Sequence, residues 1–338
     1  MDTQILIYSI GLGLISFILV FILLPQWISF ANKKGLVGRD VHKPDQPIVA
    51  EMGGVVGIAV FIFILGLSLL FIDDLQVKKE IWALILGVLI AYLVGIWDDW
   101  KTLSAIQKPL LLIFAAVPVF LLHTYYPKPI FPLIGETRMT IIYMFLLPFV
   151  VAVPANAVNM LDVLNGSMLG SAIIITLGII ASAFIIPSNY INQEILVLVS
   201  FILLGVLLAM YYYNRYPAKV FNGDTGSLGV GAVFGLLAVI GRLEFIILIA
   251  LIPHITNSFS ILSSIKGLKE RRQIPRPVSV KDGKIIASDS ESAPITLVRL
   301  LTAAKPLTEK SIVIRIWILT FTSTLLAIIS ALIIRWSL

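Results

Sequence analysis

Two adjacent acids, Asp98 and Asp99, stand at the end of an apolar stretch. A carboxylate at membrane depth costs ~2.5–3.5 kcal/mol unless it is paired or hydrated, and two neighbouring carboxylates repel each other. A nearby cation relieves this repulsion, and Mg²⁺, Lys101 and Lys108 are candidates. The alternative interpretation is an acidic helix end at the water interface, where Trp97 and Trp100 serve as interfacial anchors.

A second polar cluster repeats at every third position, with Asn156, Asn159, Asp162 and Asn165 in order. On a helix these residues stay on one broad face. Amide and carboxylate oxygens suit a hard cation such as Mg²⁺. The alternative is hydrogen bonding between helices, which is common in membrane bundles.

The densest polar run covers residues 214–227. Its glycines Gly223 and Gly226 free the backbone for close approach to a ligand. Asp224 can bind a metal, and Phe221 offers a flat ring on which a base can stack. Thr225 and Ser227 are expected to cap the helix that follows, although capping alone does not account for the whole run.

A fourth cluster is basic and contains Arg271, Arg272 and Arg276, with Gln273 between them. Guanidinium groups bind diphosphate oxygens through two parallel hydrogen bonds. The alternative is a basic loop that binds lipid headgroups.

The composition places these clusters in a membrane protein. Of the 338 residues, 59% are hydrophobic and 13% are charged, whereas a soluble globular chain is ~45–50% apolar and ~25% charged. There is no cysteine, and the three histidines are widely separated, which excludes thiolate sites and disfavours a histidine zinc site. The net charge of +6 indicates loop topology and anionic lipid rather than nucleic acid.

The chain is expected to be an all-α polytopic membrane protein with a single domain over residues 1–338. About 20 apolar residues cross the hydrocarbon core, and ten segments fit this length. They are 4–29, 53–72, 81–97, 108–124, 139–154, 167–187, 194–213, 226–241, 243–265 and 312–335.

Lysine and arginine counts predict the orientation of these spans. The connections that follow odd-numbered spans hold 18 of these residues, the other side holds six, and Arg315 begins the last span. By the positive-inside rule the odd connections are cytoplasmic and both termini are outside. These cytoplasmic loops contain all four polar clusters, so one shared site is predicted. The loops are about 30–52, 98–107, 155–166, 214–225 and 266–311, and the last is expected to hold a β-hairpin over 278–287 and a short helix over 295–303.

Three of these motifs together resemble the polyprenyl-phosphate N-acetylhexosamine-1-phosphate transferase superfamily, glycosyltransferase family 4. They are Gly95 to Asp99, Asn156 to Gly166 and Tyr216 to Gly226. The fifth loop, with no histidine between Arg271 and Arg276, is most similar to UDP-N-acetylglucosamine–dolichyl-phosphate N-acetylglucosamine-1-phosphate transferases. Arg272 and Gln273 depart from that pattern where the sugar is read.

The resemblance implies a role for each matching residue. Mg²⁺, or Mn²⁺ in its place, is held by Asn159 and Asp224. Asp98 or Asp99 orients or deprotonates the lipid phosphate, Lys108 and Arg271 contact the diphosphate, and Asp162 has a catalytic role. Phe221 stacks on uracil, with Asn165 nearby. The remaining substrate contacts come from Lys43, Glu51, Asn156, Arg272, Gln273 and Arg276.

The implied reaction transfers N-acetylglucosamine 1-phosphate, or a related sugar phosphate, from a UDP-sugar to dolichyl or polyprenyl phosphate and releases UMP. Such an enzyme starts a lipid-linked oligosaccharide for protein N-glycosylation or a related surface glycan. The same resemblance implies inhibition by tunicamycin and a homodimer. It also implies a location in the cell membrane of an archaeon or the ER membrane of a eukaryote. The alternatives are a secondary transporter of an ion or anionic metabolite, disfavoured because the acids sit on one face, and a non-catalytic scaffold.

Overall fold

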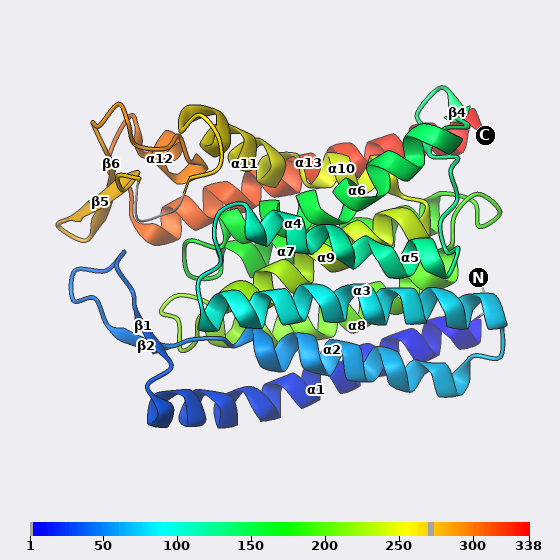
Figure 1. Cartoon of the computed structure of the whole chain (residues 1–338), viewed down its shortest axis with the longest axis horizontal. Coiled ribbons are helices and arrows are strands. Elements are labelled where there is room, and N and C mark those ends of the chain that lie inside the picture. The colour runs from blue at the N-terminus through cyan, green and yellow to red at the C-terminus, as the bar shows by residue number, and fades with distance from the viewer. Residues whose placement is uncertain (1–2, 270–273) are drawn as a thin grey trace.

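Apolar helices lie side by side along the long axis of the molecule (Figure 1). The computed structural model describes residues 3–269 and 274–338. Within them, eight helices are long and apolar enough to cross a membrane, or nine if one bent pair is a single span. The prediction of a multi-pass, all-α membrane protein is therefore confirmed. The eight are α1 (Thr3–Lys34), α2 with the short η1 (Gly54–Ser68 and Leu69–Phe71), α3 (Leu75–Trp100), α6 (Thr140–Leu161), α7 (Ser167–Ile185), α8 (Gln193–Asn214), α9 (Gly223–Gly241) and α13 (Glu309–Ser337).

Two of the ten predicted spans differ from simple helices. The segment expected at 108–124 is a shorter apolar helix, Gln107–Leu121, made of α4 (Gln107–Ile113), η2 (Phe114–Ala116) and α5 (Val117–Leu121). The segment expected at 243–265 is broken into α10 (Glu244–Ala250) and α11 (Ile252–Ser264), bent by 67°. Pro253, near the start of α11, has no backbone N–H to continue the helix across the break.

Helix α9 is the centre of the bundle and is almost entirely buried. It packs mainly against α3 and α6, and also against α2. Small residues allow this close packing between membrane helices. A Cβ on Gly95 of α3 would lie 2.4 Å from the Cα of Thr225, and a Cβ on Gly54 of α2 would lie 2.2 Å from Gly226. Both approaches occur at the first turn of α9, so the backbones meet where the polar residues are.

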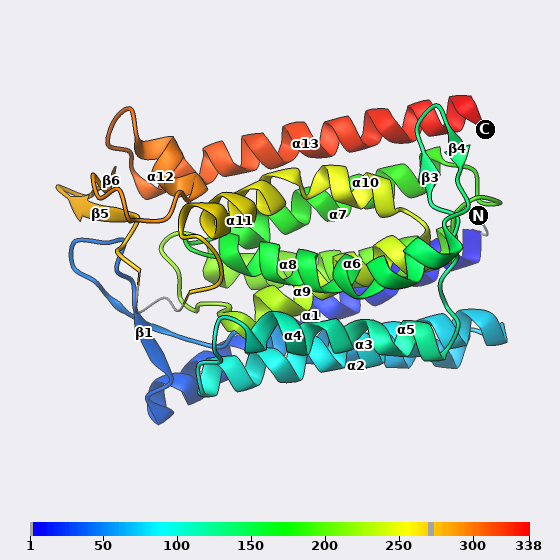
Figure 2. The ribbon, with the colours of Figure 1, turned by 45° about the horizontal axis from the view of Figure 1, so that its top comes forward.

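Short hairpins cover both ends of the bundle. At one end lie β1 and β2, β5 and β6, and α12, while β3, β4 and both chain termini lie at the other (Figures 1 and 2). Each pair of strands is antiparallel. These elements are β1 (Val37–Arg39), β2 (Ile48–Ala50), β3 (Ile130–Phe131), β4 (Gly135–Glu136), β5 (Val278–Lys281), β6 (Lys284–Ala287) and α12 (Leu297–Thr302). The predicted hairpin at 278–287 and the short helix near 295–303 are thereby confirmed.

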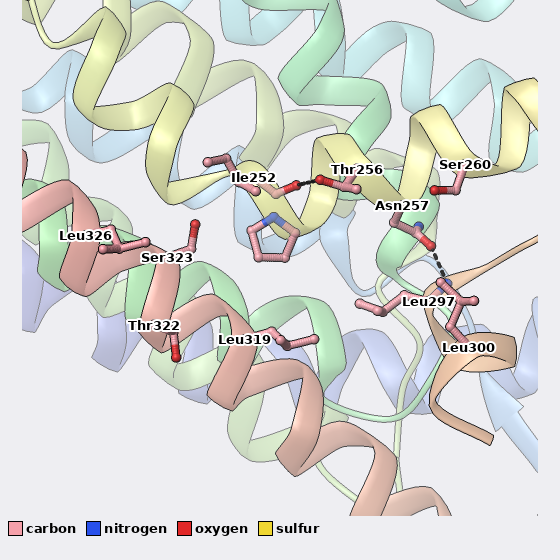
Figure 3. Close-up of a pocket in the computed structure, with 11 residues that line it drawn as sticks. Ile252, Thr256, Asn257, Ser260, Leu297, Leu300, Leu319, Thr322, Ser323 and Leu326 are labelled. Carbon is pink, nitrogen blue, oxygen red and sulfur yellow. Dashed lines mark hydrogen bonds between the residues drawn. The ribbon is translucent and has the colours of Figure 1, made fainter. Parts of the chain in front are cut away.

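The bend between α10 and α11 opens a groove beside α13. The groove has a volume of about 330 Å³ and is lined by residues of α11, α12 and α13 (Figure 3). At its inner end, Asn257 accepts a hydrogen bond from the Leu297 amide (2.8 Å) and donates one to the Met160 carbonyl (3.2 Å). Asn257 therefore ties α11 to both α12 and the last turn of α6.

Three helices extend beyond their predicted ends. Helix α1 continues past residue 29 to Lys34, so the loop expected at about 30–52 begins later than predicted. Helix α3 continues through Asp98 and Asp99 to Trp100, and α6 continues through Asn156 and Asn159 to Leu161. The expected loops at 98–107 and 155–166 thus begin later than predicted. Hydropathy marks where apolar residues stop, whereas the helical hydrogen bonds continue into the polar residues.

Candidate active site

Four side chains from four helices meet at the end of the bundle that carries β5 and β6. Lys108 of α4 forms an ion pair with Asp98 of α3. The Lys108 ammonium also lies 3.1 Å from Asp224 Oδ2 of α9 and 3.4 Å from Asn159 Oδ1 of α6. We call these four residues the Lys108 cluster. One ammonium thus holds oxygens from three different helices.

Within the Lys108 cluster the acids differ in exposure. The Asp98 side chain is 1% exposed, and its Oδ1 accepts a hydrogen bond from the Leu103 amide (2.6 Å). The Asp224 side chain is 31% exposed. Asn159 donates to Asp224 Oδ1 and to the Ser227 hydroxyl, the latter over 2.8 Å. Asp224 is therefore the acid that a ligand from solution can reach, while its position is fixed by Asn159 and Lys108.

Asp99 caps α9 from a neighbouring helix. Its carboxylate accepts hydrogen bonds from the amides of Asp224 (2.7 Å) and Thr225 (3.0 Å) and from the Thr225 hydroxyl (2.6 Å). These are donors of the first turn of α9, which have no partner within the helix. The prediction that Thr225 caps the helix is wrong, because its hydroxyl donates to Asp99 instead of accepting from the backbone. Asp98 and Asp99 thus do different work: one pairs with Lys108, and the other positions Asp224.

Asp162 follows the end of α6, and both of its carboxylate oxygens accept hydrogen bonds from the side-chain amide of Asn222 (3.2 and 3.1 Å). The pKa of Asp162 is raised to about 7, mainly by burial and also by the charges of Asp224 and Asp99, which together outweigh the lowering effect of the Asn222 hydrogen bonds. Asn222 is the residue before α9. Asp162 therefore links the loop after α6 to the turn that carries Asp224.

The connection between α1 and α2 brings Glu51 to the same place. The Phe221 amide donates to the Ala50 carbonyl (2.8 Å), and the Gly53 amide donates to the Phe221 carbonyl (2.9 Å). This pairing sets Glu51 beside Phe221. Burial, followed by the charges of Asp99 and Asp224, raises the pKa of Glu51. Residues far apart in sequence, predicted to line one site, are here adjacent.

A second buried cluster surrounds Lys43. The Lys43 ammonium pairs with Asp40, lies 2.8 Å from Asn165 Oδ1 and lies 3.2 Å from Glu309 Oε2. Asn165 also donates to Asp40 (3.1 Å) and accepts from the Ala218 amide (2.8 Å). We call Asp40, Lys43, Asn165 and Glu309 the Lys43 cluster. Sequence reasoning missed Asp40 and Glu309, because neither belongs to a spaced motif.

Other predicted site residues lie outside both clusters. Asn156 donates to the Ala152 carbonyl of its own helix (2.8 Å), and Arg276 is exposed. The regular spacing of the asparagines did not keep them together, because Asn156 bonds within its own helix and Asn165 lies beyond the end of α6 at Leu161. Arg271, Arg272 and Gln273 lie outside the described residues.

The Lys108 cluster offers oxygen ligands of the kind that Mg²⁺ prefers. Its ammonium already occupies a point between oxygens of Asp98, Asn159 and Asp224, so these side chains can surround a cation. Among residues 3–269 and 274–338, no three acidic, histidine or cysteine side chains form a metal site by themselves. Mg²⁺ commonly binds through one or two carboxylates together with substrate phosphates and water, and this arrangement fits that pattern.

At the opposite end of the bundle, the acids are bonded to other partners. Glu136 pairs with Arg242, Glu244 accepts a hydrogen bond from the Tyr143 hydroxyl (2.5 Å), and Glu80 accepts one from Asn192 (2.6 Å). The expectation that polar groups occur on one face alone is therefore too simple. These pairs tie helices together where β3 and β4 lie.

Comparison with known proteins matches the helices that build this site. The model of glycosyl transferase family 4 matches residues 81–242, which span α3 to α9. A Saccharolobus solfataricus protein named as a UDP-N-acetylglucosamine–dolichyl-phosphate N-acetylglucosaminephosphotransferase is 32% identical over 72% of this chain and 74% of its own length.

Other relatives match as well. A Streptococcus uberis phospho-N-acetylmuramoyl-pentapeptide-transferase is 29% identical over 76% of this chain and 80% of its own length. A Methanocaldococcus jannaschii protein named as a glycosyltransferase is 28% identical over 89% of this chain and 91% of its own length. The matched segment contains Asp98, Lys108, Asn159 and Asp224, and the chain belongs to glycosyl transferase family 4.

Proposed function

We propose that this protein transfers N-acetylglucosamine 1-phosphate from UDP-N-acetylglucosamine to dolichyl or polyprenyl phosphate and releases UMP. The Lys108 cluster carries this proposal, because it places a cation and reachable acid oxygens at the end of an apolar bundle. Family membership and the printed name of the S. solfataricus relative support the substrates. A lipid acceptor also explains why the site lies at the end of membrane helices.

In the proposed reaction, an oxygen of the lipid phosphate forms a bond to the β-phosphorus of the sugar nucleotide. The bond from that phosphorus to the bridging oxygen breaks, and the oxygen leaves with UMP. A phosphate monoester is largely ionised near neutral pH, so no strong base is required. Catalysis rests on positioning and on neutralising charge.

The residues of the site divide these tasks. Lys108 binds phosphate oxygens with an ammonium that is already held between Asp98 and Asp224. Asp98 keeps Lys108 in place, and through Lys108 it orients the acceptor phosphate. Asn159 and Asp224 would hold Mg²⁺, which, when bound, stabilises charge on the diphosphate. Phe221 supplies the stacking surface for uracil beside Glu51, and Arg271, Arg272, Gln273 and Arg276 contact the sugar phosphate.

We also propose the orientation that lysine and arginine counts favour. The end that carries β5 and β6 faces the cytoplasm, and the termini face outside. In this arrangement Gln107–Leu121 also crosses the membrane. Together with the eight long helices and the bent pair α10–α11 it brings the number of spans to the predicted ten. The transporter alternative is less favoured, since it leaves the match to a transferase family unexplained.

The test is an assay of purified protein in detergent with dolichyl phosphate and UDP-N-acetylglucosamine, with Mg²⁺ or with EDTA. Release of UMP together with a lipid diphosphate sugar, in Mg²⁺ and not in EDTA, supports the proposal. Asp224→Asn is the inactive control, and tunicamycin is expected to inhibit the wild type. UMP release from another UDP-sugar alone would keep the reaction and change the sugar. No UMP from any UDP-sugar, together with solute uptake by sealed vesicles, would favour the transporter.

A further inference from the structure

Glu309 is a buried acid to which the transfer chemistry above gives no task. It is 5% exposed and is the first residue of α13. Its Oε1 accepts a hydrogen bond from the Asn165 amide (2.8 Å), and its Oε2 lies 3.2 Å from the Lys43 ammonium. An acid in the first turn of a helix is favourable by itself, but that role requires neither burial nor these two distant partners.

On one side, Glu309 connects to the Lys108 cluster through the loop after α6. Asn165 stands three positions after Asp162, whose carboxylate is held by Asn222 (3.1 and 3.2 Å). The next residue, Gly166, donates through its amide to Asn214 (3.0 Å). A shift of the Asn165 backbone is therefore passed to Asp162 and to the turn before Asp224.

On the other side, Glu309 connects to the long segment before α13. Leu307, two positions earlier, pairs with Ile285 of β6 through hydrogen bonds in both directions (2.8 and 3.1 Å). The same segment contains the basic residue Arg276 and the hairpin β5–β6. Glu309 is thus the point at which this segment meets the loops after α1 and α6.

We propose that Glu309 is a positioning residue for binding of the sugar nucleotide. It holds the Asn165 loop and the Lys43 loop against the start of α13, and so fixes the position of the side chains that surround the uracil and the diphosphate. This inference rests on the proposed transferase function. The acceptor lipid phosphate is positioned by Lys108, which Glu309 reaches only indirectly through Asp162 and Asp224, so its binding is expected to change less than that of the sugar nucleotide.

The charges of the Lys43 cluster make the substitutions informative. Two buried carboxylates, Asp40 and Glu309, share the single ammonium of Lys43. Glu309→Gln keeps an oxygen that can accept from the Asn165 amide and leaves a balanced Asp40–Lys43 pair. Glu309→Ala removes both acceptors, so a buried amide loses its partner, which is the more costly change.

The experiment compares steady-state kinetics of the wild type, Glu309→Gln and Glu309→Ala in detergent. The matched control is Glu291→Ala, which removes an exposed acid of the same segment. We expect KM for UDP-N-acetylglucosamine to rise about tenfold in Glu309→Ala, equal to ~1.4 kcal/mol, and two- to threefold in Glu309→Gln. The KM for dolichyl phosphate stays within twofold, and Glu291→Ala matches the wild type.

Thermal unfolding and direct binding of UDP are measured on the same samples. An equal rise in both KM values, or a fall in kcat and stability with an unchanged sugar-nucleotide KM, would overturn the positioning role and leave Glu309 as a simple helix end. If Glu309→Ala does not fold, weaker UDP binding by Glu309→Gln supports the inference, and wild-type affinity overturns it. An inactive wild type would instead count against the proposed function, so the two failures are distinguishable.

Discussion

Asp98→Asn and Asp99→Asn, although they change adjacent residues, should produce different defects. Asp99 accepts three hydrogen bonds from the first turn of α9, whereas an asparagine has a single acceptor oxygen in place of two. In either orientation of the amide, at least one backbone N–H of Asp224 or Thr225 loses its partner. Asp98→Asn, by contrast, retains an oxygen for the Leu103 amide.

The magnitude follows from these contacts. A buried N–H without a partner costs ~1–3 kcal/mol, and loss of a negative charge at a helix N-terminus costs a further ~0.3–1 kcal/mol. Asp99→Asn should therefore lower the free energy of unfolding by about 1.3–4 kcal/mol. Because Asp224 then moves with the first turn of α9, the Asp99→Asn enzyme should also need a higher Mg²⁺ concentration for half-maximal rate.

The assay combines denaturant unfolding in EDTA with UMP release at several Mg²⁺ concentrations. Asp98→Asn should lose turnover with a loss of unfolding free energy below about 1 kcal/mol, since Lys108 keeps its 3.1 Å contact with Asp224. Asp99→Asn should lose stability and need more Mg²⁺ for half-maximal rate. If the two variants show the same loss of stability and the same Mg²⁺ dependence, the division of roles between the two acids is incorrect.

Three further substitutions test other contacts. Lys108→Met removes the cation between two acids, so we expect Mg²⁺ to raise its thermal midpoint more than that of the wild type; an equal rise would contradict placement of Mg²⁺ here. The folded-state pKa of Asp162 is about 7, above an unfolded value of ~3.9, so the wild type loses stability as pH rises from 4 to 7. In EDTA, the unfolding free energy of Asp162→Asn minus that of the wild type should therefore rise by about 1–3 kcal/mol from pH 5 to pH 8. A difference that does not change with pH would refute this. Asn257→Ala leaves the Leu297 amide without a partner and should cost ~1–3 kcal/mol of unfolding free energy, whereas Thr322→Ala on the same groove, whose hydroxyl bonds within its own helix, should cost little.

Hydropathy predicted most spans well, because an apolar stretch long enough to cross the bilayer is recognised from its own residues, without knowledge of its neighbours. The segments at 167–187, 194–213 and 312–335 all appear as helices close to those bounds. The break between α10 and α11 was not predicted, because both halves are apolar and hydropathy does not report direction. The Asp282-Gly283 hairpin turn was predicted, since it depends on two neighbouring residues that adopt positive φ.

The assignment of roles within the site could not be predicted from spacing. Asn159, Asp162 and Asn165 look equivalent in sequence, yet they contact Asp224, Asn222 and the Lys43 cluster respectively. The difference arises where α6 ends, because residues past that point no longer share a helix face. Regular spacing predicted that these residues are close to one another, and the helix boundary decided what each one contacts.

Glu309 was missed for a related reason. After Thr308, which caps α13 by accepting from the Ser311 amide, a glutamate reads as an ordinary first-turn acid. Its contacts with Lys43 and Asn165 span more than 140 positions of sequence. A local pattern carries no information on such pairs.

The capping of α9 also decides how phosphate can be bound at this site. A free helix N-terminus attracts anions through its unpaired amides. Here the amides of Asp224 and Thr225 both donate to Asp99, and a carboxylate already occupies the position that a phosphate would take. Gly95 brings α3 close enough for this contact. The anionic substrates must therefore be bound by side-chain cations, which explains why Lys108 lies at the centre of the site.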